Sequence, residues 1–137
     1  MPDAITIRTH LRPGSRFLRA AFVLYALALF TLTHWPRFTV DIPGVERPDL
    51  FVHLAAFGIW TLLLNLASFL GPPHTARTVL LTALVAAVYA GIDEGLQALP
   101  FLQRTAAWDD LAADLLGVAS ATAACLIPFA FRRPKAS

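Results

Sequence analysis

The chain has 137 residues, of which 57% are hydrophobic and 15% are charged, and its formal net charge is +2. A soluble globular domain has about 45–50% apolar and about 25% charged residues, so this composition excludes an ordinary water-soluble surface. The small net charge gives no sign of nucleic-acid binding, and one domain is expected at this length. A single-domain membrane protein, in contact with the lipid bilayer, is therefore the first expectation.

The chain begins with a polar and basic stretch, residues 1–16, that shows no hydrophobic periodicity. We expect a cytoplasmic tail here, because basic residues concentrate on the cytoplasmic side of membrane proteins. The rival interpretation is the charged start of a signal peptide. However, the apolar run 17–35 is longer than a signal-peptide core of about 7–15 residues, and no small-residue cleavage pattern closes it. We therefore predict a retained first helix.

Three further apolar runs follow. Residues 36–48 contain three prolines and Gly44, which predicts a loop because proline cannot continue a helix. A second run covers 49–70, a third covers 78–99 and a fourth covers 107–131. A helix of about 20 residues crosses a hydrocarbon core of about 30 Å, so each run is long enough to span a membrane.

Four spans with short links predict an all-α membrane protein, a four-transmembrane-helix antiparallel bundle over residues 17–131. Strands are disfavoured because the runs are long, rich in Leu and Ala, and not alternating. Lys and Arg are more frequent in the 1–16 tail, the 71–77 link and the 132–137 tail than on the opposite side. The positive-inside rule then places both termini in the cytoplasm, for a multi-pass protein of the inner (cytoplasmic) membrane.

Polar side chains interrupt the apolar pattern at the predicted outer ends of the spans. Ionisable groups inside a membrane are costly, so they normally face a bundle interior or a watery cavity and mark a functional site. We therefore predict one polar pocket that faces outside the cytoplasm. The predicted lining is Asp49 and His53 of the second run, Tyr89, Asp93, Glu94 and Gln97 of the third, Arg104 of the next link, and Asp110 and Asp114 of the fourth.

Helical spacing supports this grouping. Asp49 and His53 are four residues apart and so share one helix face, as do Asp110 and Asp114. At 1.5 Å per residue, Asp114 lies about 10 Å inside the start of the fourth run at Ala107. Snorkelling of the short aspartate side chain does not explain that depth, which supports a place for Asp114 in the polar pocket.

Several polar or small residues also have structural explanations. Asp109 lies in the first turn of the fourth helix, where an acid complements the helix dipole. Arg104 is a counter-ion for nearby carboxylates in this interpretation. Gly91 and Gly95 form a small-xxx-small face that predicts close helix approach, and Gly117 is assigned to helix packing as well.

Two kinds of binding chemistry fit the predicted pocket. Arg104 and nearby helix N-termini would hold an anionic headgroup or a carboxylate. Alternatively, the acids of the third and fourth runs share a proton or a divalent cation such as Mg²⁺ or Ca²⁺. The sequence contains no glycine-rich phosphate loop, H-E-x-x-H or G-x-S-x-G motif. No catalytic residue is assigned, and no cofactor is expected.

Three pieces of sequence combine into a more specific pattern over residues 49–120. They are Asp-x-x-x-His at a helix start (Asp49, His53), Asp-Glu-x-x-Gln at a helix end (Asp93, Glu94, Gln97), and Arg104 followed by Asp110, Asp114 and Gly117. This pattern resembles the VanZ-like family of small bacterial membrane proteins, named for a teicoplanin-resistance protein. The chain departs from the family at Leu50, where many members have lysine, and at Asp114, where asparagine is common.

The resemblance implies a multi-helix inner-membrane protein with a link to glycopeptide tolerance and envelope homeostasis. The leading hypothesis is a non-enzymatic protein that binds an envelope lipid, a lipid-linked cell-wall precursor or a glycopeptide at its outward pocket. The alternative is a membrane enzyme acting on a lipid or lipid-linked phosphate or ester, with His53 and the carboxylates as acid/base groups or metal ligands. Passage of protons or ions through the acidic cluster is a third hypothesis.

Overall fold

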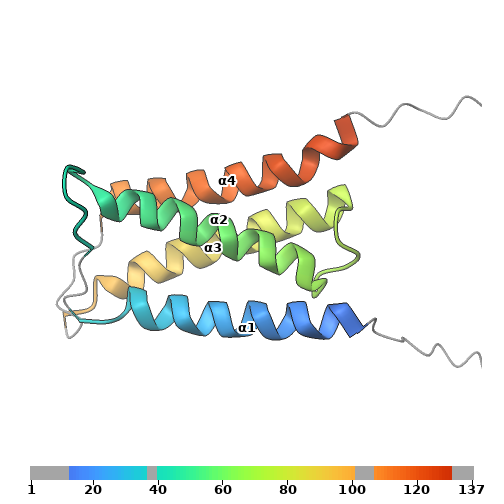
Figure 1. Cartoon of the computed structure of the whole chain (residues 1–137), viewed down its shortest axis with the longest axis horizontal. Helices are drawn as coiled ribbons and strands as arrows, with labels where there is room; N and C mark the ends of the chain where they lie inside the picture. The colour runs from blue at the N-terminus through green and yellow to red at the C-terminus, as the bar shows by residue number, and fades with distance from the viewer. Residues whose placement is uncertain (1–12, 37–39, 101–106, 131–137) are drawn as a thin grey trace, which may run out of the picture.

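The computed structural model describes residues 13–36, 40–100 and 107–130, and these residues form helices and links without a strand. Four helices follow one another along the chain (Figure 1). They are α1 (Pro13–Thr33), α2 (Pro48–Ala67), α3 (Ala76–Gln97) and α4 (Trp108–Ala130). Each helix is long and apolar enough to cross a membrane. The predicted class, an all-α chain with four candidate membrane spans, is confirmed.

The helix ends differ from the predicted apolar runs by a few residues. α1 begins at Pro13, inside the stretch assigned to a polar tail. α2 ends at Ala67, because Ser68 takes a left-handed backbone conformation (φ 57°) that ends the helix. α3 begins after Thr75, whose side-chain oxygen accepts the amide N–H of Thr78 at 3.3 Å as an N-cap. The predicted tail residues 1–12 and 132–137 lie outside the described residues.

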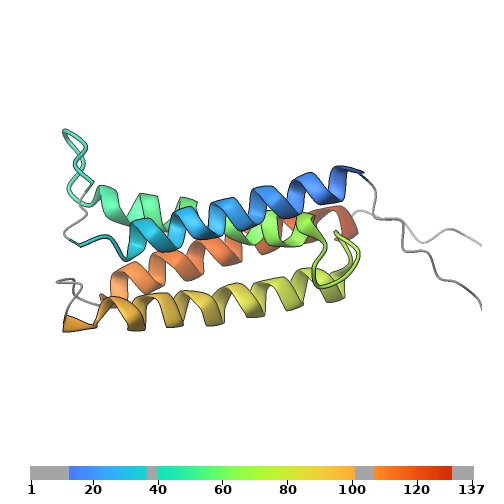
Figure 2. The same cartoon turned by 90° about the horizontal axis from the view of Figure 1, so that it is seen from below.

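The four helices lie side by side as a bundle (Figures 1 and 2). The end of α1, the start of α2, the end of α3 and the start of α4 lie at one end, called here the polar end. The link between α2 and α3 lies at the other end, together with the start of α1 and the close of α4. α2 packs against the other three helices, most extensively against α4, whereas α1 packs chiefly against α2.

Aromatic side chains of α2 and α3 pack together at the centre of the bundle. Phe57 and Trp60 of α2 are buried, and the indole of Trp60 stacks on the ring of Tyr89 with centroids 5.0 Å apart. Trp60 therefore packs inside the bundle. Many large apolar side chains remain on the outside, including Leu84 of α3 and Leu116 of α4. An apolar exterior of this extent suits a lipid environment.

α2 and α4 make their closest approach at two glycines. A Cβ built on Gly117 would overlap the carbonyl oxygen of Leu54 and lie 2.9 Å from the amide nitrogen of Gly58. Only a residue without a side chain fits between the two backbones. By contrast, a Cβ on Gly91 or Gly95 would meet no atom within 4 Å in the described part of the chain. That face of α3 lines a small pocket with Ala107, Trp108 and Leu111 at the start of α4, so the described residues show no close helix approach at Gly91 or Gly95.

Arg19 fixes α1 to the end of α2 that lies away from the polar end. Its Nε donates to the carbonyl oxygen of Ala67 at 3.0 Å, and its terminal nitrogen Nη2 donates to that of Ser68 at 3.2 Å. These carbonyls close α2, where a positive charge complements the helix dipole. The guanidinium also lies 5.0 Å from the centre of the Phe69 ring.

Candidate functional site

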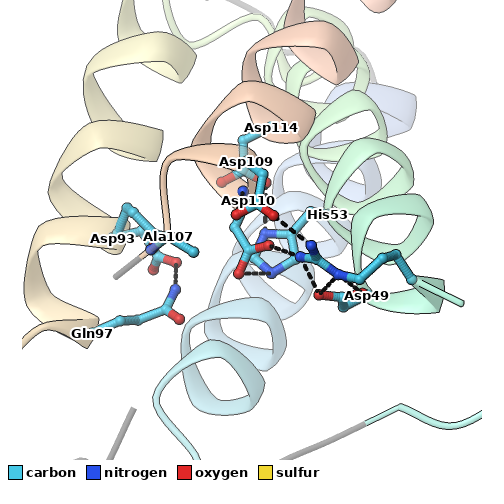
Figure 3. A network of polar contacts seen from close by, with 10 residues as sticks. Asp49, His53, Asp93, Gln97, Ala107, Asp109, Asp110 and Asp114 are labelled. Carbon is cyan, nitrogen blue, oxygen red and sulfur yellow. Dashed lines mark hydrogen bonds and ion pairs between the residues drawn. The ribbon is translucent and has the colours of Figure 1, made fainter. Parts of the chain in front are cut away.

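Asp49 at the start of α2 lies near Asp109 and Asp110 at the start of α4 (Figure 3), and Arg47 joins the two helix starts by contacting these aspartates. Its guanidinium donates to Asp49 at 2.9 Å, to Asp109, and to Asp110 at 3.5 Å. Hydrogen bonds to Asp49 and Asp109 raise the pKa of the Arg47 guanidinium above its usual value. Sequence reasoning had placed Arg47 in a loop and missed this role. Its position two residues before Asp49 was the available signal.

His53 and Asp114 form a buried pair between α2 and α4. His53 Nδ1 lies 2.8 Å from Asp114 Oδ1, and Asp114 is completely buried. The other ring nitrogen, Nε2, lies 3.8 Å from Asp110 Oδ2, which is too long for a hydrogen bond. When Nδ1 carries the proton that it donates to Asp114, Nε2 of the neutral ring is a hydrogen-bond acceptor. The structure thus pairs two of the predicted pocket residues, His53 and Asp114.

Glu94 holds α3 against the start of α4. One carboxylate oxygen accepts the amide N–H of Ala107, the residue before α4. The first N–H groups of a helix have no hydrogen-bond acceptor inside the helix, and the Glu94 carboxylate supplies one to the N–H group that precedes α4. The second oxygen, Oε2, is buried without a hydrogen-bond partner among the described residues. The contact assigns Glu94 to the joint between the two helices.

Asp93 forms a second polar cluster that joins α3 to α1. Its Oδ1 accepts the hydroxyl of Thr33 at 3.1 Å, and its Oδ2 accepts the side-chain amide of Gln97 at 3.1 Å. His34 Nδ1 lies 3.7 Å from Oδ1. Asp93 is completely buried, yet both of its oxygens have donors. Thr33 and His34 were not predicted, although they are the polar residues at the end of the first apolar run.

A groove of about 620 Å³ lies between α1 and α2 and carries polar groups at one end. Thr33, Asp49, His53 and Asp110 line it at the polar end of the bundle. The remaining wall is apolar and reaches Ile59, ten residues after Asp49 on α2. At 1.5 Å per residue, the groove extends about 15 Å along α2, or about half of a 30 Å hydrocarbon core.

The residues predicted to line one pocket are therefore divided among several neighbouring polar clusters. Asp49, His53 and Asp110 line the groove, and Asp114 supports His53 from behind. The remaining predicted residues lie elsewhere: Asp93 and Gln97 in the second cluster, Glu94 against Ala107, and Tyr89 in the aromatic core. Arg104 lies outside the described residues.

The positions of the described acids can be compared with the alternative in which they bind a divalent cation. Within the ranges 13–36, 40–100 and 107–130, no three His, Cys, Asp or Glu side chains come together as a set that could hold a metal ion. The acids of α2, α3 and α4 instead have nitrogen or hydroxyl partners, such as Arg47 for Asp109 or Thr33 for Asp93. The arrangement favours hydrogen bonding over metal coordination.

The fold and the site define a small multi-pass membrane protein whose four helices carry buried polar clusters at one end. Comparisons with protein families, with curated proteins and with solved structures give no match to this chain. The resemblance to the VanZ-like family stands on the motifs quoted above.

Proposed function

We propose that this protein binds one envelope lipid or lipid-linked precursor in the groove between α1 and α2. The observation that carries the proposal is the division of the groove into a polar end and an apolar length. Asp49, His53 and Asp110 would contact a head group, and the wall toward Ile59 would contact an apolar chain. Binding sites for small molecules are mostly apolar with a few placed polar groups, which is the pattern here.

The proposal includes an orientation. The helices would alternate in direction across the inner membrane, with both termini in the cytoplasm and the polar end outside. Two observations support it. The basic residues of the tails and the 71–77 link satisfy the positive-inside rule. In addition, the start of α1, the close of α4 and the α2–α3 link lie at the same end of the bundle (Figure 1).

Labelling of single cysteines tests this orientation. In a Cys125→Ala background, Ile42→Cys near the polar end should react with a membrane-impermeant maleimide on intact cells. His74→Cys, in the α2–α3 link, should react only after permeabilisation. Both residues are exposed, so accessibility within the protein does not differ. The opposite labelling pattern would place the polar end in the cytoplasm and contradict the orientation.

A substitution that fills the groove tests binding itself. Ala55 lines the groove, and Ala55→Trp should weaken binding of a single-chain pyrene-labelled lipid by about tenfold or more, because the indole occupies the chain's place. Fluorescence titration of the purified protein in detergent measures the affinity. Ala119→Trp is the matched control, since Ala119 is exposed on α4 and does not line the groove. Equal binding by the two variants would refute the groove as the site.

The envelope role extends this proposal. The resemblance to the VanZ-like family suggests that the bound molecule takes part in glycopeptide tolerance, teicoplanin included, or in envelope homeostasis. In a strain whose tolerance depends on the protein, the Ala55→Trp variant should then fail to bind the ligand and also fail to support tolerance. If tolerance is unchanged although the variant no longer binds the ligand, ligand binding in the groove is not the cause of tolerance.

One observation favours the alternative of a membrane enzyme. His53 lines the groove with Asp114 behind it at 2.8 Å, and a buried carboxylate behind a histidine is how many enzymes orient a general base. In such an enzyme, Nε2 would take the proton of a water or hydroxyl that attacks a lipid ester or phosphate, and the ester bond would break. Release of a free acid or alcohol from bound lipid would distinguish the enzyme from a binding protein.

A further inference from the structure

We infer that the head group held at the polar end of the groove is a protonated amine on a single apolar chain. This inference rests on the proposed function and names the chemical class of the ligand. The anionic headgroup expected from Arg104 is the competing class. The choice between them follows from the donors and acceptors that line the groove.

Every side-chain donor that lines the groove already has an acceptor. The hydroxyl of Tyr25 donates to the carbonyl oxygen of Ala56 at 3.0 Å, and that of Thr33 donates to Asp93 at 3.1 Å. In the neutral ring with its proton on Nδ1, the N–H of His53 is directed at Asp114, 2.8 Å away. A phosphate or carboxylate placed in the groove would therefore find no free side-chain donor among these residues.

Acceptors, in contrast, remain free at the same place. His53 is buried, with 8% of its surface exposed, and its Nε2 has no hydrogen-bond partner among the described residues. Nε2 and Asp110 Oδ2 lie 3.8 Å apart and do not form a hydrogen bond with each other. A ligand group with N–H donors, placed beside them, would donate a hydrogen bond to each of these two acceptors. The side chain of His53 is largely buried and lines the groove, and its unpartnered Nε2 is the observation that points to a ligand.

The number of donors favours an ammonium over a hydroxyl. An ammonium group carries three N–H donors, whereas a hydroxyl carries one. The acceptors that line the polar end include the Asp49 carboxylate, the Asp110 carboxylate and, with the proton on Nδ1, His53 Nε2, so several acceptors are within reach of one head group. Each carboxylate oxygen accepts more than one hydrogen bond, so the contacts with Arg47 leave acceptor capacity.

Charge favours the same choice. The Arg47 guanidinium is shared by three aspartates, Asp49, Asp109 and Asp110. One positive charge does not balance three carboxylates, and a cation brought beside them lowers that repulsion. The volume of about 620 Å³ falls within the range of about 300–1,000 Å³ for a site that holds one small ligand, which fits one chain better than two.

Three probes with the same dodecyl chain test the inference: dodecylamine, dodecanol and dodecyl phosphate. Each is titrated against purified protein loaded with the pyrene-labelled lipid, near neutral pH, where an alkyl amine is protonated. Dodecylamine should displace the label at a concentration about tenfold lower than either other probe. A preference for dodecyl phosphate, or equal potency of all three, would overturn the amine assignment and leave the lipid-binding groove standing. Failure of the label and of every probe to bind would overturn the proposed function as well.

Two neighbouring aspartates supply a matched pair of variants. Asp110→Asn should abolish the preference for the amine, because Asp110 lines the groove. Asp109→Asn removes the same charge from the next residue, which contacts Arg47 but does not line the groove, and should keep the preference. If Asp110→Asn does not fold, Asp49→Asn replaces it, since Asp49 lines the groove and is partly exposed. An unchanged preference in the folded groove variant would refute the inference.

Discussion

Replacing Gly117 with alanine should destabilise the bundle by about 3 kcal/mol or more, and replacement with leucine should prevent folding. The physical reason is that a Cβ at this position overlaps the backbone carbonyl of Leu54, which cannot rotate away as a side chain would. α2 and α4 would have to separate along the most extensive helix contact in the molecule. Thermal unfolding of the purified protein in detergent, followed by circular dichroism, measures the loss.

Gly91→Ala is the matched control for this substitution. Gly91 also lies inside an apolar helix, but a Cβ there meets nothing within 4 Å in the described chain. Alanine is a better helix former than glycine by about 1 kcal/mol, so this variant should be as stable as the original protein or slightly more stable. If Gly117→Ala unfolds at the same temperature as Gly91→Ala, the close crossing of α2 and α4 is wrong.

Replacing Asp114 with leucine should cost about 3–5 kcal/mol, the second large effect. The substitution leaves the Nδ1–H of His53 without an acceptor in a buried place. Asp114→Asn should cost much less, because the asparagine oxygen still accepts that hydrogen bond. Denaturation of the three proteins in the same detergent gives the comparison.

Asp109→Leu controls for the loss of an aspartate from α4. The Asp109 side chain is 47% exposed, and its ion pair with Arg47 is open to solvent, so its removal should change stability little. Both aspartates are in α4, and each has a basic partner: Asp109 contacts Arg47 and Asp114 contacts His53. Equal losses for Asp109→Leu and Asp114→Leu would show that burial of the His53–Asp114 pair does not contribute to stability.

Much of the fold was predictable because it depends on local composition. Long apolar runs closed by Pro36 and by the Gly71–Pro73 turn predict membrane helices without knowledge of their neighbours, since hydrocarbon thickness sets their length. The depth of Asp114 in its helix likewise indicated a place in a polar interior. Its spacing from Asp110 placed both residues on one face, and the structure directs that face at His53.

The partners of these residues were less accessible to sequence reasoning. Among the described residues the counter-ion at the polar end is Arg47, which sequence reasoning did not single out, and the roles predicted for Arg104 stay predictions because that residue lies outside the described ranges. Which loop residue meets which helix depends on how the links fold back over the helix ends, and apolar periodicity does not specify this. The same holds for Thr33, whose hydroxyl reaches Asp93 across sixty residues of chain.

Glycine positions show the same limit. Gly91 and Gly95 repeat at four-residue spacing and predicted helix contact, yet the contact is made by Gly58 and Gly117, on different helices. A small-residue pattern shows which face permits close approach. The rotation of each helix about its own axis decides which face is used, and that rotation follows from packing of residues such as Phe57 and Trp60 in the core.

α1 is hydrogen-bonded to other helices near each of its two ends, and between them the Tyr25 hydroxyl donates to the carbonyl oxygen of Ala56 of α2 at 3.0 Å. Arg19 holds one end to the last carbonyls of α2, and Thr33 holds the other to Asp93. Between these anchors α1 and α2 form the two sides of the groove, and lining residues such as Ala28 and Val52 are exposed on the outside of the bundle. A lipid bound there, as proposed, would enter sideways from the bilayer and would not have to pass through water first.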